Sequence, residues 1–162
     1  MILGSSIYQR NGRRWHHGPH NRPFDFNGDG FNDLALSREI SDTLMVLDVY
    51  FGGADFDSIP DWTNYYETAT RSSVGFYSTS SGYDVNGDGY QDLFLRGNQS
   101  DGERRQRIFY ELFLGGEDPD TVAVFHLWDG EFQNNFNPVV MEDGYSLLPD
   151  LNDDGFAEFA AQ

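Results

Sequence analysis

The chain has 162 residues, of which 38% are hydrophobic and 16% aromatic, so it holds enough apolar material for the core of one domain. Its formal net charge is −17, with 27 acidic and 10 basic residues, and this excess of acid argues against a nucleic-acid partner, which requires basic contacts to phosphate. No apolar run is long enough to cross a bilayer, which argues against membrane insertion, and the lack of cysteine excludes disulfides.

The order of apolar and turn residues predicts an all-β protein. Leu, Val, Phe and Tyr lie in short runs between Gly, Asp, Asn and Ser, and no run of ten or more residues has a helical period. The first half is expected to form strands at residues 2–8, 33–36, 43–51, 62–66 (an edge strand) and 74–80, with 15–17 beginning a further strand. The second half is expected to form strands at residues 92–95, 107–114, 122–128 and 139–148, with a polar loop at 97–105.

A ten-residue pattern occurs three times, beginning at Asp25, Asp84 and Asp150. Oxygen-bearing side chains stand at positions 1, 3, 5 and 9, glycine at position 6 and a large aromatic residue at position 7. Ca2+ binds about six to eight oxygens on a tightly turned backbone, and glycine permits the dihedral angles of such a turn. Position 7 would contribute its backbone carbonyl, which leaves its side chain free to pack elsewhere.

The pattern therefore predicts up to three structural Ca2+ sites, the alternative being ordinary Asp/Asn/Gly surface turns. The predicted ligands are Asp25, Asn27, Asp29, Phe31 and Asp33; Asp84, Asn86, Asp88, Tyr90 and Asp92; and Asp150, Asn152, Asp154, Phe156 and Glu158.

Position 12 distinguishes these loops from helix-flanked calcium loops. An EF-hand loop lies between two helices and needs a bidentate Glu at position 12. Here position 12 is Leu36, Leu95 and Ala161 in the three copies. The pattern therefore indicates a short loop between two strands that is closed by its ninth residue.

The spacing of the copies indicates a structural repeat. Asp25 and Asp84 are 59 residues apart, and Asp84 and Asp150 are 66 apart. A second marker keeps the same phase, since Tyr50–Gly53 aligns with Phe113–Gly116. A period of about 60 residues with about four strands is typical of a β-propeller blade. The chain is thus expected to be one segment, residues 1–162, of about two and a half blades of four antiparallel strands, with units near 15–73, 74–138 and a partial 139–162.

These residues resemble the FG-GAP repeats of integrin-α-like β-propellers. The resemblance is carried by the Asp-x-Asn-x-Asp-Gly-x-x-Asp-Leu segments at 25–34 and 84–93, by the weaker copy at 150–159, and by the Gly-Gly segments at 50–53 and 113–116. It implies four-stranded blades that each hold Ca2+ in the hairpin between the first two strands. The chain departs from the family pattern in lacking Gly-Ala-Pro after the second strand and in having Glu158 where the family has Asp.

The resemblance also implies a ring of more blades than this chain supplies. The ring would be completed by further propeller blades or by self-association of several copies, and an open arc is the less favoured alternative because it exposes sheet faces and edges. The family likeness implies an extracellular or cell-surface location, although residues 1–6 do not read as a signal peptide.

We expect a calcium-stabilised, non-enzymatic recognition or scaffolding module that binds a protein or a glycan. The alternative is a lectin-like or accessory domain of a secreted carbohydrate-active enzyme, which needs exposed aromatic residues and polar groups beside a pocket between blades. A calcium-dependent polysaccharide-active enzyme is a third hypothesis, and it requires a further cluster of carboxylate, Arg or His side chains outside the loops, which the sequence does not reveal.

Other side chains are assigned to structural roles. His16, His17 and His20 are interpreted as an exposed turn rather than a metal site, and His126 as a histidine with a hydrogen-bond partner in a sheet. Arg104–Arg107 is placed in the polar loop. A set of aromatic residues is assigned mainly to packing, with stacking on sugars as the alternative: Trp15, Trp62, Tyr65, Tyr66 and Trp128.

Overall fold

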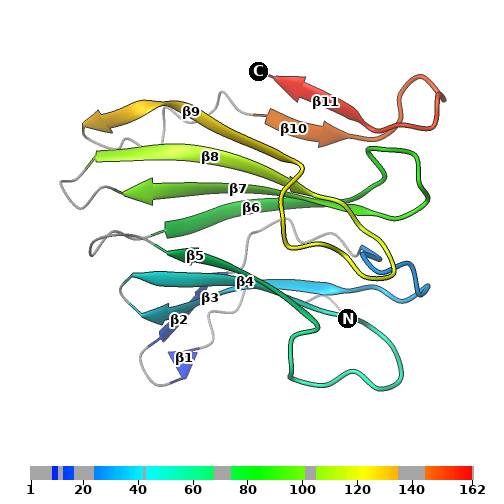
Figure 1. Ribbon diagram of the computed structural model, residues 1–162, viewed down its shortest axis with the longest axis horizontal. Helices are drawn as coiled ribbons and strands as arrows, with labels where there is room; N and C mark the ends of the chain where they lie inside the picture. The colour runs from blue at the N-terminus through cyan, green and yellow to red at the C-terminus, as the bar shows by residue number, and fades with distance from the viewer. Residues whose placement is uncertain are drawn as a thin grey trace.

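The structure is a computed structural model that describes residues 9–10, 13–16, 24–41, 43–67, 74–100, 105–134 and 145–161 (Figure 1). Every regular element in these ranges is a β-strand and every strand pair is antiparallel, which confirms the all-β prediction. Over the same ranges no helix occurs that could span a membrane. The strand expected at 2–8, the residues His17 and His20, and the first part of the strand expected at 139–148 lie outside the described residues.

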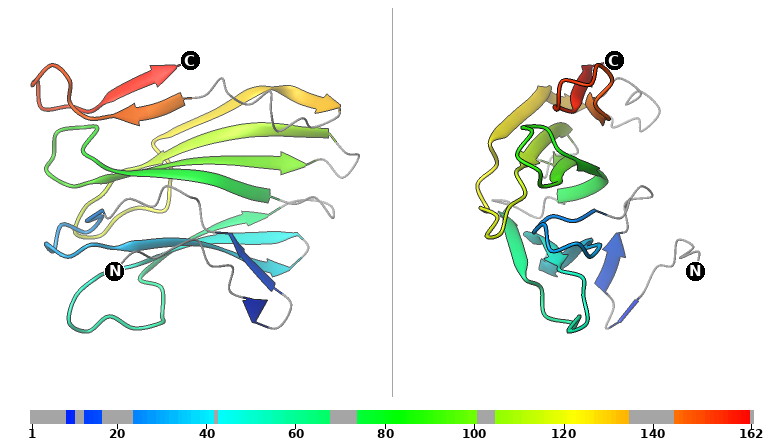
Figure 2. Two further views of the ribbon diagram at one scale, coloured as in Figure 1. Left: turned by 180° about the vertical axis from the view of Figure 1, so that it is seen from behind. Right: turned by 90° about the vertical axis from the view of Figure 1, so that its right-hand side faces the viewer.

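The strands form three sheets that follow one another in chain order (Figures 1 and 2). The first sheet has the order β1-β2-β3-β4-β5, with β1 at Gln9–Arg10, β2 at Arg13–His16, β3 at Leu34–Ser41, β4 at Leu44–Tyr50 and β5 at Trp62–Glu67. The second has the order β6-β7-β8-β9, with β6 at Val74–Tyr83, β7 at Asp92–Ser100, β8 at Arg105–Phe113 and β9 at Phe125–Asn134. The third pairs β10 at Tyr145–Leu148 with β11 at Glu158–Ala161.

The polar stretch at 97–105 is not the loop that its composition predicted. Strand β7 continues to Ser100 and β8 already begins at Arg105, with Gln99 opposite Arg107. Backbone hydrogen bonds extend this hairpin whatever the side chains are, and polar side chains suit the part of a hairpin that meets water. The placement of Arg105–Arg107 in a loop was therefore wrong, and Arg104 lies outside the described residues.

The loop before β9 reaches back to the first sheet. Strand β9 begins at Phe125 rather than at Val122, because the preceding residues form a loop that packs near β5. The Trp62 indole N–H donates to the backbone carbonyl of Asp120 at 3.2 Å. The connection between β8 and β9 of the second sheet thereby contacts β5 of the first.

The first and second sheets share one hydrophobic core. Trp62 on β5 is 5% exposed, and its ring makes edge contacts with Phe26 at 5.7 Å and with Phe113 of β8 at 5.2 Å between centroids. The other face of the second sheet buries a separate cluster that includes Phe94 and Tyr110. Because both faces of β7 and β8 are covered, their central residues read as continuous apolar runs rather than as an alternation.

Replacement of Trp62 by Ala is expected to lower the free energy of unfolding by about 3–5 kcal/mol, because the cavity would open where the two sheets meet. Chemical denaturation followed by circular dichroism measures this. Tyr65→Ala on the same strand is the matched control, since its ring is 65% exposed, and it should change the stability by less than about 1 kcal/mol. Equal losses for the two variants would contradict a shared core at Trp62.

Candidate metal loops

The three predicted loops lie at the same end of the stacked sheets (Figure 1). Residues 25–33 lead into β3, residues 84–91 connect β6 to β7, and residues 149–157 connect β10 to β11. No helix flanks any of them in the part of the chain that the structure describes. The prediction of loops between strands is confirmed for the second and third loops, and the first leads into β3 from residues outside the described part of the chain.

Within each loop, side-chain oxygens accept hydrogen bonds from the backbone of the same loop. In the first loop the Asp25 carboxylate accepts the N–H groups of Asp29 at 3.0 Å and Gly30 at 2.8 Å. The Asn27 amide oxygen also accepts the Asp29 N–H, at 3.1 Å, so oxygens of positions 1 and 3 converge on the loop interior. The Asp29 carboxylate in turn accepts the N–H of Phe31 at 2.8 Å. The second and third loops repeat this set of bonds.

The tight turn needs a left-handed backbone at two positions, not at position 6 alone. In the second loop Gly87, at position 4, has φ 72° and Gly89, at position 6, has φ 94°. The third loop has Asp153 at position 4 with φ 60°, and Asp is among the few residues other than glycine that adopt this conformation readily. The sequence analysis missed position 4, although Gly28 and Gly87 were a signal for it.

The carboxylate at position 9 joins the loop to the Gly-Gly marker. Asp92 is fully buried, and its two oxygens accept the N–H of Val85 at 2.6 Å and of Gly115 at 2.9 Å. Asp33 does the same with Phe26 at 2.7 Å and Gly52 at 2.8 Å. We call this pair of bonds the position-9 lock. It explains why the two sequence markers keep a common phase.

Glycine is required at the marker end of the lock. A Cβ at Gly115 would lie 2.7 Å from the Phe26 carbonyl oxygen and would overlap that of Gln91. At Gly52 it would overlap the carbonyl oxygen of Asn32. In the third loop Glu158 reaches the N–H of Leu151 at 2.7 Å, so the longer side chain still makes the first bond of the lock.

The loops concentrate negative charge. Burial raises the pKa of Asp92 to about 6, the N–H bonds from Gly115 and Val85 oppose the rise, and the charges of Asp88 and Asp84 add to it. Burial likewise raises the pKa of Asp33. Carboxylates that repel one another in this way favour a bound cation.

Successive loops are packed against one another. The Tyr90 ring, at position 7, lies on Gly28 of the first loop, where a Cβ would overlap it. Phe156 lies in the same way on Gly87, 3.2 Å from a Cβ built there. The Gln91 side chain accepts the N–H of Asp25 at 2.9 Å. Gly116 donates to the Phe26 carbonyl at 2.9 Å and Ala157 to the Asp84 carbonyl at 3.0 Å, which extends the contacts along all three loops.

The oxygen chemistry of the loops fits Ca2+, since carboxylate, amide and backbone carbonyl oxygens are its preferred ligands. The oxygens of positions 1 and 3 accept backbone N–H groups inside the loop, and the position-9 carboxylates accept backbone N–H groups at its base. Among the residues that the structure describes, no three His, Cys, Asp or Glu side chains form a group that could hold a metal ion. Calcium binding by the predicted ligands stays a prediction.

The residues outside the loops are also placed. The Nδ1 of His126 lies 2.8 Å from a Glu111 oxygen, which confirms a partnered histidine in a sheet. The structure brings Glu111 and His126 together with Tyr66 between the first two sheets, a cluster that the sequence analysis missed.

A comparison with protein-family models, with curated proteins and with solved structures finds no match to this chain.

Asp92→Ala is expected to lower the free energy of unfolding by roughly 2–4 kcal/mol in the presence of EDTA, because the N–H groups of Val85 and Gly115 both lose their acceptor. Asp88→Ala is the matched control, since Asp88 is an exposed carboxylate of the same loop and water can replace it. It should cost less than about 1 kcal/mol under these conditions. Urea denaturation of both variants checks this, and a similar small loss in both would contradict a structural role for position 9.

Proposed function

We propose that this chain is a calcium-stabilised, non-catalytic recognition or scaffolding module whose sheets are blades of a propeller-like repeat. The observation that supports this best is the continuous row of three loops, in which the aromatic residue of one loop lies on the glycine of the preceding one. Such a row turns each loop into part of the interface between repeats. Repeats that contact only their neighbours depend on these interfaces for stability.

Matching hydrogen bonds support the assignment of the first two sheets to equivalent units. The N–H of Asp61 donates to the Val49 carbonyl at 3.0 Å, and that of Val124 donates to the Leu112 carbonyl at 2.9 Å. The two donors, Asp61 and Val124, are 63 residues apart, and so are the two acceptors. The same spacing separates Gly52 from Gly115 of the lock. The repeat thus extends beyond the loop pattern to the connection between the last two strands of each sheet.

Calcium would act structurally in this proposal. Bound Ca2+ would neutralise the clustered carboxylates of each loop and hold its turn. Asp25, Asn27 and Asp29 would hold it in the first loop, Asp84, Asn86 and Asp88 in the second, and Asp150, Asn152 and Asp154 in the third. Position-7 carbonyls and the position-9 carboxylates complete the predicted sets.

The partner would be a protein or a glycan, in an extracellular or cell-surface setting, with further blades or further copies completing the ring. The lectin-like alternative is favoured by one specific observation, a pocket between the first two sheets that aromatic and polar side chains line together. The same pocket brings Glu111 and His126 together outside the loops, which is the kind of cluster that the enzyme hypothesis requires.

Addition of CaCl2 is expected to raise the melting temperature above its value in EDTA. Titration calorimetry is expected to count up to three Ca2+ sites. If the loops resemble extracellular calcium modules, with Kd of about 10⁻⁴–10⁻³ M, then about 1 mM Ca2+ stabilises each site by roughly 0.4–1.4 kcal/mol. Asp84→Ala should remove one site, whereas Asp55→Ala, the loss of an exposed acid outside the loops, should remove none. Identical melting curves in EDTA and in excess Ca2+ would rule out the calcium assignment.

A further inference from the structure

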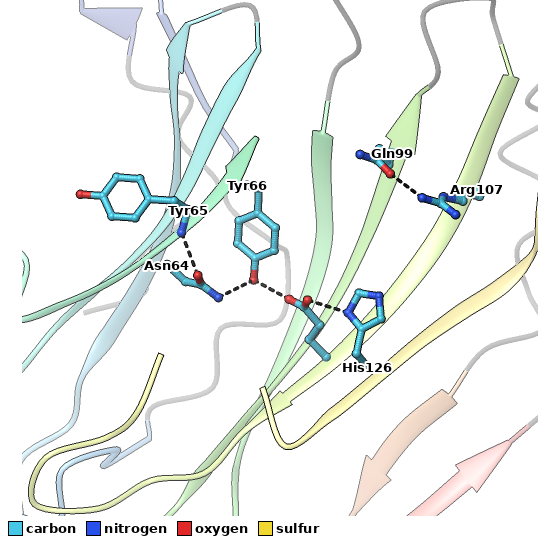
Figure 3. Close-up of polar contacts among 7 residues, drawn as sticks. Asn64, Tyr65, Tyr66, Gln99, Arg107 and His126 are labelled. Atoms are coloured by element: carbon cyan, nitrogen blue, oxygen red, sulfur yellow. Dashed lines mark hydrogen bonds and ion pairs between the residues drawn. The ribbon is translucent and has the colours of Figure 1, made fainter. Parts of the chain in front are cut away.

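A pocket of about 200 Å³ lies between β5 of the first sheet and strands β7, β8 and β9 of the second (Figure 3). Four aromatic residues and four polar or charged ones line it, counted over the described part of the chain with His126 among the polar set. Two lining residues, Glu67 and Gln99, lie near the ends of their strands. Glu67 is opposite Leu44 in the first sheet, and Gln99 is opposite Arg107 in the second. Both pairs lie beside hairpin turns rather than beside the calcium-loop pattern.

Glu111 organises the polar wall of this pocket (Figure 3). It is only 9% exposed, and one carboxylate oxygen accepts the Tyr66 hydroxyl at 2.6 Å. The other oxygen lies 2.8 Å from Nδ1 of His126. A carboxylate accepts and does not donate, so Nδ1 donates to it and the ring turns Nε2 toward the pocket. Burial raises the pKa of Tyr66, whose hydroxyl therefore stays a donor and also accepts the Asn64 amide at 3.3 Å.

Aromatic rings fix the other wall. The Phe109 ring stacks between Tyr66, at 5.8 Å and 26°, and His126, at 6.3 Å and 10°. Trp128 meets His126 edge-on at 5.0 Å. The Arg107 guanidinium lies 3.3 Å above the Trp128 ring and holds it from one side. These contacts set the pocket side chains in one arrangement before any ligand binds, which lowers the entropy cost of binding.

The groups that remain for a ligand are a mixture of donors and acceptors. Gln99 uses its carbonyl oxygen for Arg107 at 3.0 Å, so its amide N–H groups are the part of the side chain that a ligand can engage. His126 presents Nε2 from a side chain that is 39% exposed, and Glu67 presents an exposed carboxylate. The Tyr65 ring is 65% exposed and points away from this cluster (Figure 3), because neighbouring residues of a strand face opposite sides of the sheet.

This mixture selects the chemistry of the ligand. An anion would meet the carboxylates of Glu67 and Glu111, and a cation would meet the amide donors of Gln99 and the nearby Arg107 charge. A hydroxyl group both donates and accepts, so it suits Gln99, His126 and Glu67 alike. Aromatic rings provide apolar faces for the C–H face of a ring that carries hydroxyls.

We propose that this pocket binds one pyranose ring of a neutral glycan. Its volume of about 200 Å³ leaves room for a ligand of the size of one sugar ring. The proposal rests on the recognition role proposed above and names its ligand class. It does not depend on calcium, because none of the described residues that line the pocket belongs to a predicted metal loop.

The test is ligand-observed NMR on the full chain with a panel of neutral monosaccharides as methyl glycosides, including glucose, galactose, mannose and N-acetylglucosamine, and with choline as a cationic comparison. At about 0.3 kcal/mol per heavy atom, a single sugar ring should bind with Kd on the order of 1 mM. We expect at least one sugar to bind and choline not to bind. Binding of choline with no sugar binding would overturn the proposal in favour of a cation site.

Variants locate the binding. Gln99→Ala, which removes the amide donors, and His126→Ala, which removes Nε2, should each weaken the sugar at least tenfold. Phe56→Ala is the matched control, since Phe56 is an aromatic residue 55% exposed in a turn away from the pocket, and it should bind as the unmodified chain does. Gln99→Ala keeps the test valid if His126→Ala fails to fold. Sugar binding that neither pocket variant weakens, or no sugar binding at all, would overturn the proposal.

The same measurements in EDTA and in CaCl2 separate this proposal from the calcium assignment. Sugar binding with no effect of calcium on melting would leave the pocket standing and remove the calcium role. A calcium-dependent melting temperature with no sugar binding would do the reverse.

Discussion

The arrangement of the first two sheets depends on the buried position-9 carboxylates of the first two loops, Asp33 and Asp92. Asp92 accepts one N–H from the start of its own loop and another from Gly115, which lies 23 residues further along the chain. Asp33 makes the equivalent bonds to Phe26 and Gly52. The lock fixes the loop onto the end of its sheet, and so it decides where the position-7 aromatic ring can lie. Without that placement, Tyr90 could not cover Gly28 of the preceding loop.

The stacking of the loops and the shared core together hold the first two sheets against each other. Along the loop end, Tyr90 and Gln91 contact the first loop. Deeper in the molecule, Trp62 packs between Phe26 and Phe113. Toward the hairpin turns, the Tyr66 hydroxyl donates to Glu111 of the next sheet. Apolar packing and the two kinds of polar contact thus act at different depths of the same interface, and the polar contacts around Glu111 leave the pocket between them. In the proposals made here the loops would stabilise the fold, whereas the pocket would bind the ligand.

Much of the fold could be predicted from the sequence, because its signals are local. Short apolar runs predicted β4, β5 and β6, and the lack of an acid at Leu36 and Leu95 predicted loops between strands. The polar residues 97–100 were expected to form a loop but lie in β7. Composition did not predict this, because the pairing of strands is made by backbone hydrogen bonds. The lock partner of Asp92 and the contact of Tyr90 with Gly28 could not be predicted, since both depend on how segments far apart in the chain meet. The partner of His126 is a similar case, because Glu111 lies opposite it only through the register of β8 and β9.

The amide hydrogens that the position-9 carboxylates bind offer the most direct test of whether these carboxylates hold the loops to their sheets. Hydrogen exchange by NMR, in EDTA so that no metal contributes, can follow the N–H groups of Val85 and Gly115 individually. The account predicts that both exchange slowly, and that both become fast in Asp92→Ala while the strand amides of β4 keep their protection. Fast exchange of Val85 and Gly115 in the unmodified chain would contradict it, because the carboxylate would then not hold the loop to its sheet.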